Sequence, residues 1–120
     1  MSLQTIGYHT LRIGIAAMFL WFGFSQLFNG IDWVSWVPEW AVNTLNIPPA
    51  MIVLLNGAVE VVLGAMLALG LFVRPAAILL GLHLLIITVE IGATAIGVRD
   101  FGLTMATFAL ALLVPAKVKA

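Results

Sequence analysis

Long apolar stretches separated by short turn-forming segments dominate the chain. Four of these stretches approach the roughly 20 apolar residues that a membrane-spanning helix needs. They are divided by Asn-Gly at 29–30, Pro-Pro at 48–49 and Arg-Pro at 74–75, since glycine often ends a helix and proline suits its first turn. Asp100 is the expected N-cap of the last helix. We expect helices over about residues 5–28, 50–73, 76–97 and 101–114.

A tryptophan-rich segment separates the first two expected helices. It covers residues 31–49 and carries Trp33, Trp36 and Trp40 at spacings of three and four. Tryptophan favours the membrane–water interface, so we expect a short interfacial helix or loop, or a cover over a site that opens outward. The pattern as a whole predicts an all-α fold, an integral membrane four-helix bundle that forms a single transmembrane domain over residues 1–120.

The composition agrees with a lipid environment. The chain has 120 residues, of which 63% are hydrophobic and 8% charged. A soluble domain carries about 25% charged residues, which this chain lacks. The formal net charge of zero gives no reason to expect nucleic acid as a partner, and the absence of cysteine excludes disulfide chemistry and thiolate metal sites.

The basic residues favour one orientation in the membrane. If the N-terminus is inside, the inner side carries Arg12, Arg74, Lys117 and Lys119, whereas the outer side carries Arg99 alone. Inner segments of membrane proteins are enriched in lysine and arginine. We therefore expect a multi-pass protein of the cell membrane with both termini in the cytoplasm.

Two glutamates lie within the expected spans, where an ionisable group costs about 2.5–3.5 kcal/mol and usually serves a partner or a ligand. Asn56 and Glu60 are four residues apart, and His83 and Glu90 are seven apart, so each pair shares one face of its helix. Thr104 adds a hydroxyl from the last helix. These side chains predict either a polar pocket in the outer half of the bundle or a dry core in which they bond only to each other.

Arg12 is the expected partner of Glu60. The rise per residue puts Arg12 about 8 Å toward the inside from the midplane and Glu60 within about 3 Å of it. Long side chains can close that gap, so we expect an ion pair that His83 could join. The alternative is that Arg12 extends to the inner interface. We find no nucleophile–base pair and no metal-ligand cluster, which argues against an enzyme that acts alone.

The order and spacing of several short motifs resemble the DoxX family of small four-helix membrane proteins. The resemblance covers roughly residues 11–113. It rests on Leu11-Arg12 with Phe22-Gly23 and Gln26-Leu27, on Pro48-Pro49 ahead of Glu60-x-x-x-Gly64, on Leu69-Gly70-Leu-Phe-Val-Arg74-Pro-Ala76-Ala77, and on Arg99-Asp100-Phe-Gly-Leu103.

The resemblance implies association with membrane redox systems, including quinone-linked ones, and with partner oxidoreductases. The chain departs from the family at Gln26, where lysine is usual. The first functional hypothesis is therefore an accessory subunit of a membrane redox assembly that contacts a quinone. The alternatives are a binder or carrier of a small amphipathic molecule, and a structural or assembly membrane protein. Besides lipid, the expected partner is a membrane-associated oxidoreductase or, in a homo-oligomer, further copies of the chain.

Overall fold

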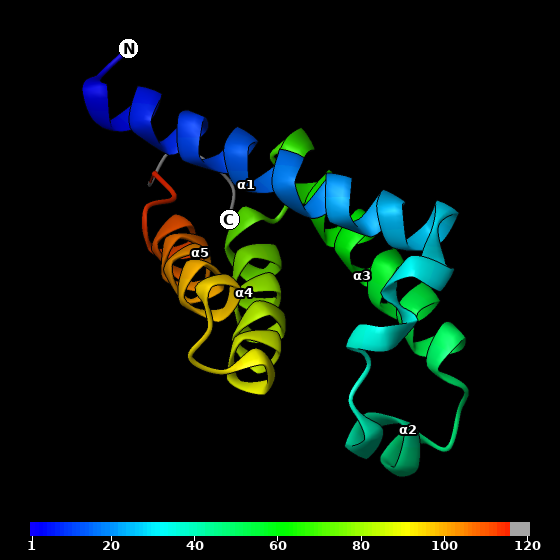
Figure 1. Ribbon diagram of the computed structural model, residues 1–120. Coiled ribbons are helices and arrows are strands. Elements are labelled where there is room, and N and C mark those ends of the chain that lie inside the picture. Colours follow the sequence, from blue (N-terminus) through cyan, green and yellow to red (C-terminus); the bar gives the residue numbers. More distant parts are fainter. Residues whose placement is uncertain (116–120) are drawn as a thin grey trace.

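The computed structural model describes residues 1–115, and within them it contains four long helices and two short ones (Figure 1). The four long helices are apolar and long enough to cross a membrane, so the fold is an all-α membrane bundle. Lys117 and Lys119, used above for the orientation, lie outside the described residues. The elements are α1 (Leu3–Phe28), the 3-10 helix η1 (Gly30–Trp36), α2 (Glu39–Leu45), α3 (Pro49–Leu69), α4 (Val73–Ile91) and α5 (Ala95–Leu112).

Capping residues set the ends of the first helices. The Ser2 hydroxyl accepts a hydrogen bond from the Thr5 amide at 3.1 Å and begins α1. Pro49 occupies the start of α3, as expected from its fixed φ angle. Gly70, at φ 73°, ends α3 in the left-handed region that glycine adopts without steric cost.

The boundary between α4 and α5 differs from the expectation. Gly92, at φ 78°, ends α4 several residues before position 97. The Thr94 hydroxyl then accepts a hydrogen bond from the Gly97 amide at 3.0 Å, so Thr94 is the N-cap of α5. Asp100 lies inside α5, and the prediction that it caps this helix is wrong. Threonine after a positive-φ glycine gives an earlier start signal than Asp100.

The long helices pack as two pairs, α1 with α3 and α4 with α5 (Figure 1). Glycine permits close approach in both pairs. A Cβ atom added at Gly57 of α3 would lie 2.9 Å from the Gly23 carbonyl oxygen of α1. A Cβ atom at Gly81 of α4 would lie 2.6 Å from the Phe108 ring of α5.

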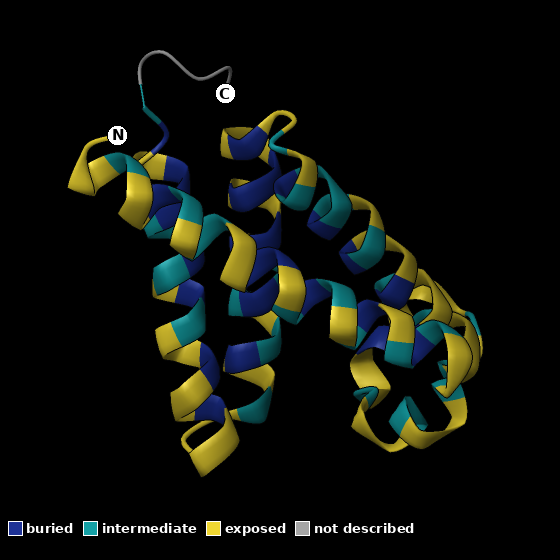
Figure 2. Ribbon diagram, turned by 90° about the horizontal axis from the view of Figure 1, so that it is seen from above, coloured by how far each residue is buried: buried dark blue, intermediate teal, exposed yellow. Residues whose placement is uncertain are grey.

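The two pairs meet near the turn between α3 and α4 and diverge toward the end that carries η1 and α2 (Figure 1). The core lies where they meet, and it includes the fully buried side chains Phe19, Leu67, Leu80 and Leu110. Buried positions face inward between the pairs in Figure 2. The divergence leaves room for a cavity between the pairs, next to η1 and α2.

Candidate functional site

A cavity of about 460 Å³ lies between the two helix pairs. All four long helices contribute to its wall, together with η1 and α2. Its size falls within the roughly 300–1,000 Å³ that is usual for small-molecule sites. Most of the wall is apolar or aromatic. The polar residues that line it are Gln26, Asn56, Glu60, His83, Glu90, Arg99 and Asp100.

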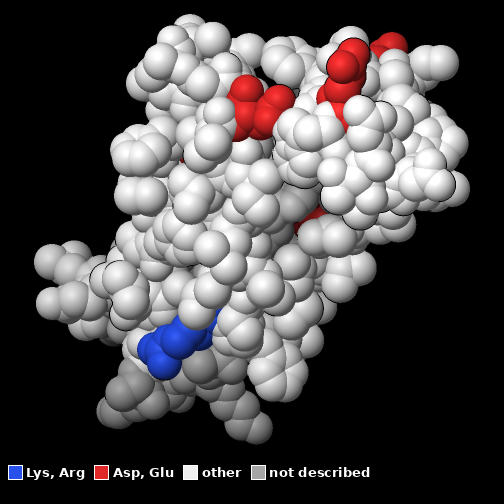
Figure 3. Space-filling model, turned by 90° about the horizontal axis from the view of Figure 1, so that it is seen from below, with Lys and Arg blue, Asp and Glu red and all other residues white. Residues whose placement is uncertain are grey.

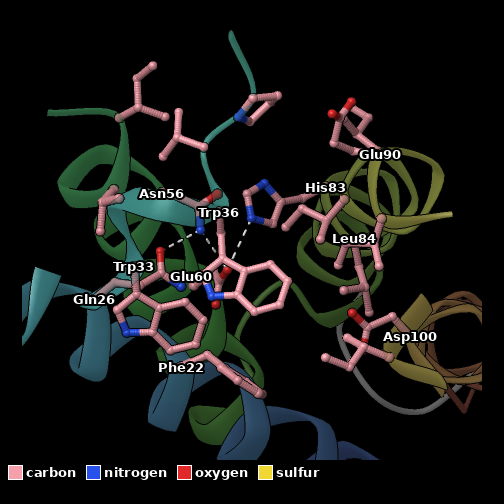
Figure 4. Close-up of a pocket in the computed structure, with 18 of the residues that line it drawn as sticks. Phe22, Gln26, Trp33, Trp36, Asn56, Glu60, His83, Leu84, Glu90 and Asp100 are labelled. Atoms are coloured by element: carbon pink, nitrogen blue, oxygen red, sulfur yellow. Dashed lines mark hydrogen bonds and ion pairs between the residues drawn. The ribbon is translucent and has the colours of Figure 1, made fainter. Parts of the chain in front are cut away.

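Glu60 is the centre of the polar cluster, and only 4% of its surface is exposed. Its Oε1 atom accepts a hydrogen bond from Asn56 Nδ2 at 2.9 Å and lies 3.2 Å from His83 Nε2. Asn56 Nδ2 also donates to Gln26 Oε1 at 2.6 Å. Figure 4 shows these four side chains turned toward one another. The cluster joins α1 and α3 to α4 across the gap between the pairs.

Two atoms of this cluster remain open to a ligand. Glu60 Oε2 and Gln26 Nε2 have no hydrogen-bond partner among residues 1–115. In that part of the chain the one fully buried side-chain polar atom without a partner is Tyr8 Oη, so the two open atoms keep an accessible face. Both residues line the cavity. The site therefore offers one hydrogen-bond acceptor and one donor on side chains that are themselves almost wholly buried.

Indole groups form the side of the cavity nearest the short helices. Trp40 Nε1 donates to Glu90 Oε2 at 2.7 Å and links α2 to α4. Trp33 Nε1 donates to Ser25 Oγ at 3.0 Å and links η1 to α1. Trp36 and Trp33 lie beside the Glu60 cluster in Figure 4. Sequence reasoning left two roles open for the tryptophan segment, and the structure places its indoles in the cavity wall.

The charges around the cavity are mostly negative. Glu60, Glu90 and Asp100 line it, and among residues 1–115 Arg99 is the one arginine or lysine in its wall. Arg99 Nε lies 3.6 Å from Asp100 Oδ1, and its side chain is 60% exposed. On the face drawn in Figure 3, acidic atoms gather at one end and around a hollow, whereas basic atoms lie toward the other end.

A comparison with known protein families finds a match for this chain. Residues 7–94, more than half of the chain, match the DoxX family. The chain belongs to the DoxX family. No curated protein and no solved structure matches it. The family match covers every cavity-lining residue of this DoxX protein except those on α5.

Arg12 does not pair with Glu60 in this DoxX protein, so that prediction is wrong. Arg12 Nη1 instead donates to the carbonyl oxygens of Leu67 at 2.6 Å and Ala68 at 2.9 Å. These carbonyls belong to the last turn of α3, which carries the negative end of the helix dipole. The Leu67 carbonyl oxygen also accepts a hydrogen bond from the capping Gly70 amide at 3.2 Å. Glu60 lies about 10 Å further along α3 by the rise per residue.

Four of the six side chains selected from sequence line the cavity, namely Asn56, Glu60, His83 and Glu90. Arg12 and Thr104 do not. Thr104 is fully buried, and its hydroxyl donates to the Asp100 carbonyl oxygen at 2.7 Å. Its Oγ1 also lies 3.3 Å from Thr88 Oγ1, which places it in the contact between α4 and α5.

From α1 the sequence selection took Arg12 and left out the two residues Phe19 and Gln26. Gln26 and Phe19 lie seven residues apart on α1, and both line the cavity. Their heptad spacing with Arg12 was the available signal, because residues seven apart share one helix face. Arg99 and Asp100 were missed as lining residues because Asp100 was assigned to a helix cap.

Proposed function

We propose that this DoxX protein binds a small amphipathic molecule in the cavity between its helix pairs. The observation that carries the proposal is the pair of unpartnered atoms Glu60 Oε2 and Gln26 Nε2, on almost wholly buried residues that line a cavity whose wall is mostly apolar and aromatic. Polar groups within a membrane usually face a bundle interior or a water-filled cavity and often mark a ligand path. The polar head of the ligand would bind at Glu60, and its apolar body would pack against the aromatic wall.

A narrower proposal follows from the family. The association with membrane redox systems that membership of the DoxX family implies supports an accessory subunit of a quinone-linked assembly. A quinone ring is flat and carries carbonyl oxygens, which accept hydrogen bonds. Gln26 Nε2 offers a donor for one such oxygen, and Trp36 offers an aromatic face beside it.

Tryptophan fluorescence tests whether the cavity binds a ligand. The protein is reconstituted in nanodiscs and titrated with a decyl-substituted benzoquinone, which quenches indoles that it contacts. We expect saturable quenching that Trp36→Phe reduces, while Trp33 and Trp40 of the cavity wall retain the rest. Trp21→Phe is the matched control, since Trp21 is 64% exposed and lies outside the cavity. Quenching that does not saturate, or that Trp21→Phe reduces as much, contradicts binding of the quinone in the cavity.

Mass spectrometry of the mildly solubilised protein separates the two proposals. A redox subunit predicts an oxidoreductase that co-purifies together with a quinone. A binder without a partner predicts a retained small molecule alone. If neither is retained and the titration is also negative, the binding role is wrong and a structural or assembly role takes its place.

A further inference from the structure

The charges of the cavity restrict the ligand beyond its amphipathic character. Asp100 has an arginine neighbour in Arg99, but Glu60 and Glu90 have no lysine or arginine within ion-pair distance among residues 1–115. The partner of Glu60 that can carry charge is His83, and the partner of Glu90 is the neutral indole of Trp40. Two carboxyl groups therefore face the cavity without a fixed positive charge.

The walls of the cavity add a second, independent feature. Five aromatic side chains line it: Phe19, Phe22, Trp33, Trp36 and Trp40. The face of an aromatic ring is negative and attracts cations, and tryptophan attracts them most strongly. The attraction is stronger in surroundings of low dielectric constant than in bulk water. Carboxyl groups and aromatic faces thus favour the same sign of charge in the ligand.

The arrangement suits an extended ligand better than a bare metal ion. Within the described residues, no three histidine, aspartate or glutamate side chains lie close enough to hold a metal. Glu60 lies on α3 and Glu90 on α4, on opposite walls of the cavity. An organic cation with an apolar body can contact both walls and the indoles between them.

We propose that the ligand of this cavity is an amphipathic organic cation, such as a quaternary ammonium or phosphonium attached to aromatic or aliphatic groups. Its positive centre lies near Glu60, and its apolar groups pack against the indoles of η1 and α2. The proposal rests on the proposed function, because it names the charge of the molecule that the cavity binds. The same two carboxyl groups disfavour an anionic head group.

A pair of probes with nearly the same shape and opposite charge tests this selectivity. Tetraphenylphosphonium and tetraphenylborate are titrated into the protein in nanodiscs, and partition into protein-free nanodiscs is subtracted. A decyl-substituted benzoquinone serves as the neutral probe. We expect tetraphenylphosphonium to bind at least about tenfold more tightly than either of the other two probes. The attraction between a cation and a carboxylate a few ångströms away, in surroundings of low dielectric constant, is large enough to raise the affinity by that factor.

Three variants locate the binding site. Glu60→Gln should weaken tetraphenylphosphonium binding about tenfold, and Gln26→Lys should do the same, because a lysine there supplies Glu60 with a cation of the protein's own. Glu39→Gln is the matched control. Glu39 is an exposed carboxylate on α2 and does not line the cavity, so this variant should bind as the parent does.

Glu90→Gln keeps the test decisive if Glu60→Gln fails to fold. Glu90 is exposed at the edge of the cavity, so its replacement should leave thermal stability unchanged while weakening tetraphenylphosphonium binding severalfold. Tighter binding of tetraphenylborate or of the quinone overturns the cation proposal and leaves an amphipathic ligand in place. Saturable binding of none of the three probes overturns both proposals. Equal tetraphenylphosphonium affinity in the parent and in Glu90→Gln also overturns the cation proposal.

Discussion

At the scale of single residues, Arg12 stabilises a helix to which it does not belong. Its guanidinium, on α1, donates to two carbonyl oxygens at the end of α3. Hydrogen bonds from charged donors contribute about 1.5–3 kcal/mol, and carbonyls left without a partner cost more in a membrane than in water. We expect Arg12→Met to lower the free energy of unfolding by about 2–3 kcal/mol, measured by equilibrium unfolding in mixed micelles.

Arg74 provides the control for Arg12. Its Nε donates to a single carbonyl oxygen, that of Ala111, at 3.0 Å, and the residue is exposed. Arg74→Met should therefore lower the free energy of unfolding by about 1 kcal/mol or less. Equal losses from the two substitutions would contradict the special role of the paired contact at Arg12.

Glu60 and Glu90 differ in burial, and this difference predicts different effects on stability. Glu60→Leu leaves Asn56 Nδ2 with a single acceptor and removes the acceptor beside His83 Nε2. A buried polar group without its partner costs about 1–3 kcal/mol, so the yield of folded protein and its melting temperature should fall. Glu90→Leu breaks one exposed hydrogen bond, that from Trp40, and should leave the yield of folded protein and its melting temperature nearly unchanged. Comparable melting temperatures for the two variants would show that the Glu60 cluster contributes little.

The polar residues of the cavity could be predicted from sequence in large part, but their partners could not. Spacing along a helix fixes which residues share a face, and this predicted Asn56 with Glu60 and His83 with Glu90. The depth of a residue in the membrane, estimated from the rise per residue, does not tell how its helix is rotated or tilted, and therefore which side chains it meets. Arg12 and Glu60 have compatible depths on that estimate, yet the crossing of α1 over α3 brings Arg12 to the last turn of α3 instead.

At the scale of helices, close packing of α1 on α3 depends on glycine at one crossing point. A Cβ atom at Gly57 would lie 2.9 Å from a backbone oxygen of α1, which no side-chain rotation can relieve. Gly57→Ala should therefore separate the helices slightly and destabilise the protein by about 1–3 kcal/mol. Thermal unfolding monitored by tryptophan fluorescence checks the change.

Gly14 of α1 is the matched control for Gly57. A Cβ atom there would meet nothing within 4 Å, so Gly14→Ala should be neutral or stabilise α1 by up to about 1 kcal/mol, because alanine is the better helix former. If Gly57→Ala lowers the stability of the protein and Gly14→Ala raises it, helix packing is the cause of the loss at Gly57. The same sign for both would point to a general effect of glycine on helix stability.

Helix boundaries followed the expectation where one signal dominated and departed from it where several competed. Pro49 begins α3 as expected. The expected end at 73 and the turn at Arg74-Pro75 are wrong, because Gly70 ends α3 after Leu69 and Arg74-Pro75 lie in the first turn of α4, which begins at Val73. Between α4 and α5, glycines at 92 and 97 and candidate caps at Thr94 and Asp100 all lie within nine residues. The backbone uses the first glycine and the first cap. Pairing of the helices could not be derived, because each helix carries small residues on more than one face.

At the scale of the whole molecule, the orientation in the membrane decides which leaflet gives access to the cavity. The cavity lies at the end that holds η1 and α2, and Arg12 and Arg74 make their contacts near the opposite end, around the turn between α3 and α4. The excess of basic residues is expected on the cytoplasmic side. We therefore expect η1, α2 and the cavity to lie toward the outer leaflet.

Cysteine labelling in intact cells tests this orientation without background, because the chain has no cysteine of its own. Gln4, in the first turn of α1, and Ser35, in η1, are both exposed. A membrane-impermeant maleimide should label Ser35→Cys in intact cells and Gln4→Cys only after the membrane is opened. The reverse pattern would place the cavity on the cytoplasmic side. Labelling of both positions from one side would contradict a first helix that crosses the membrane, since nearly all of α1 lies between them.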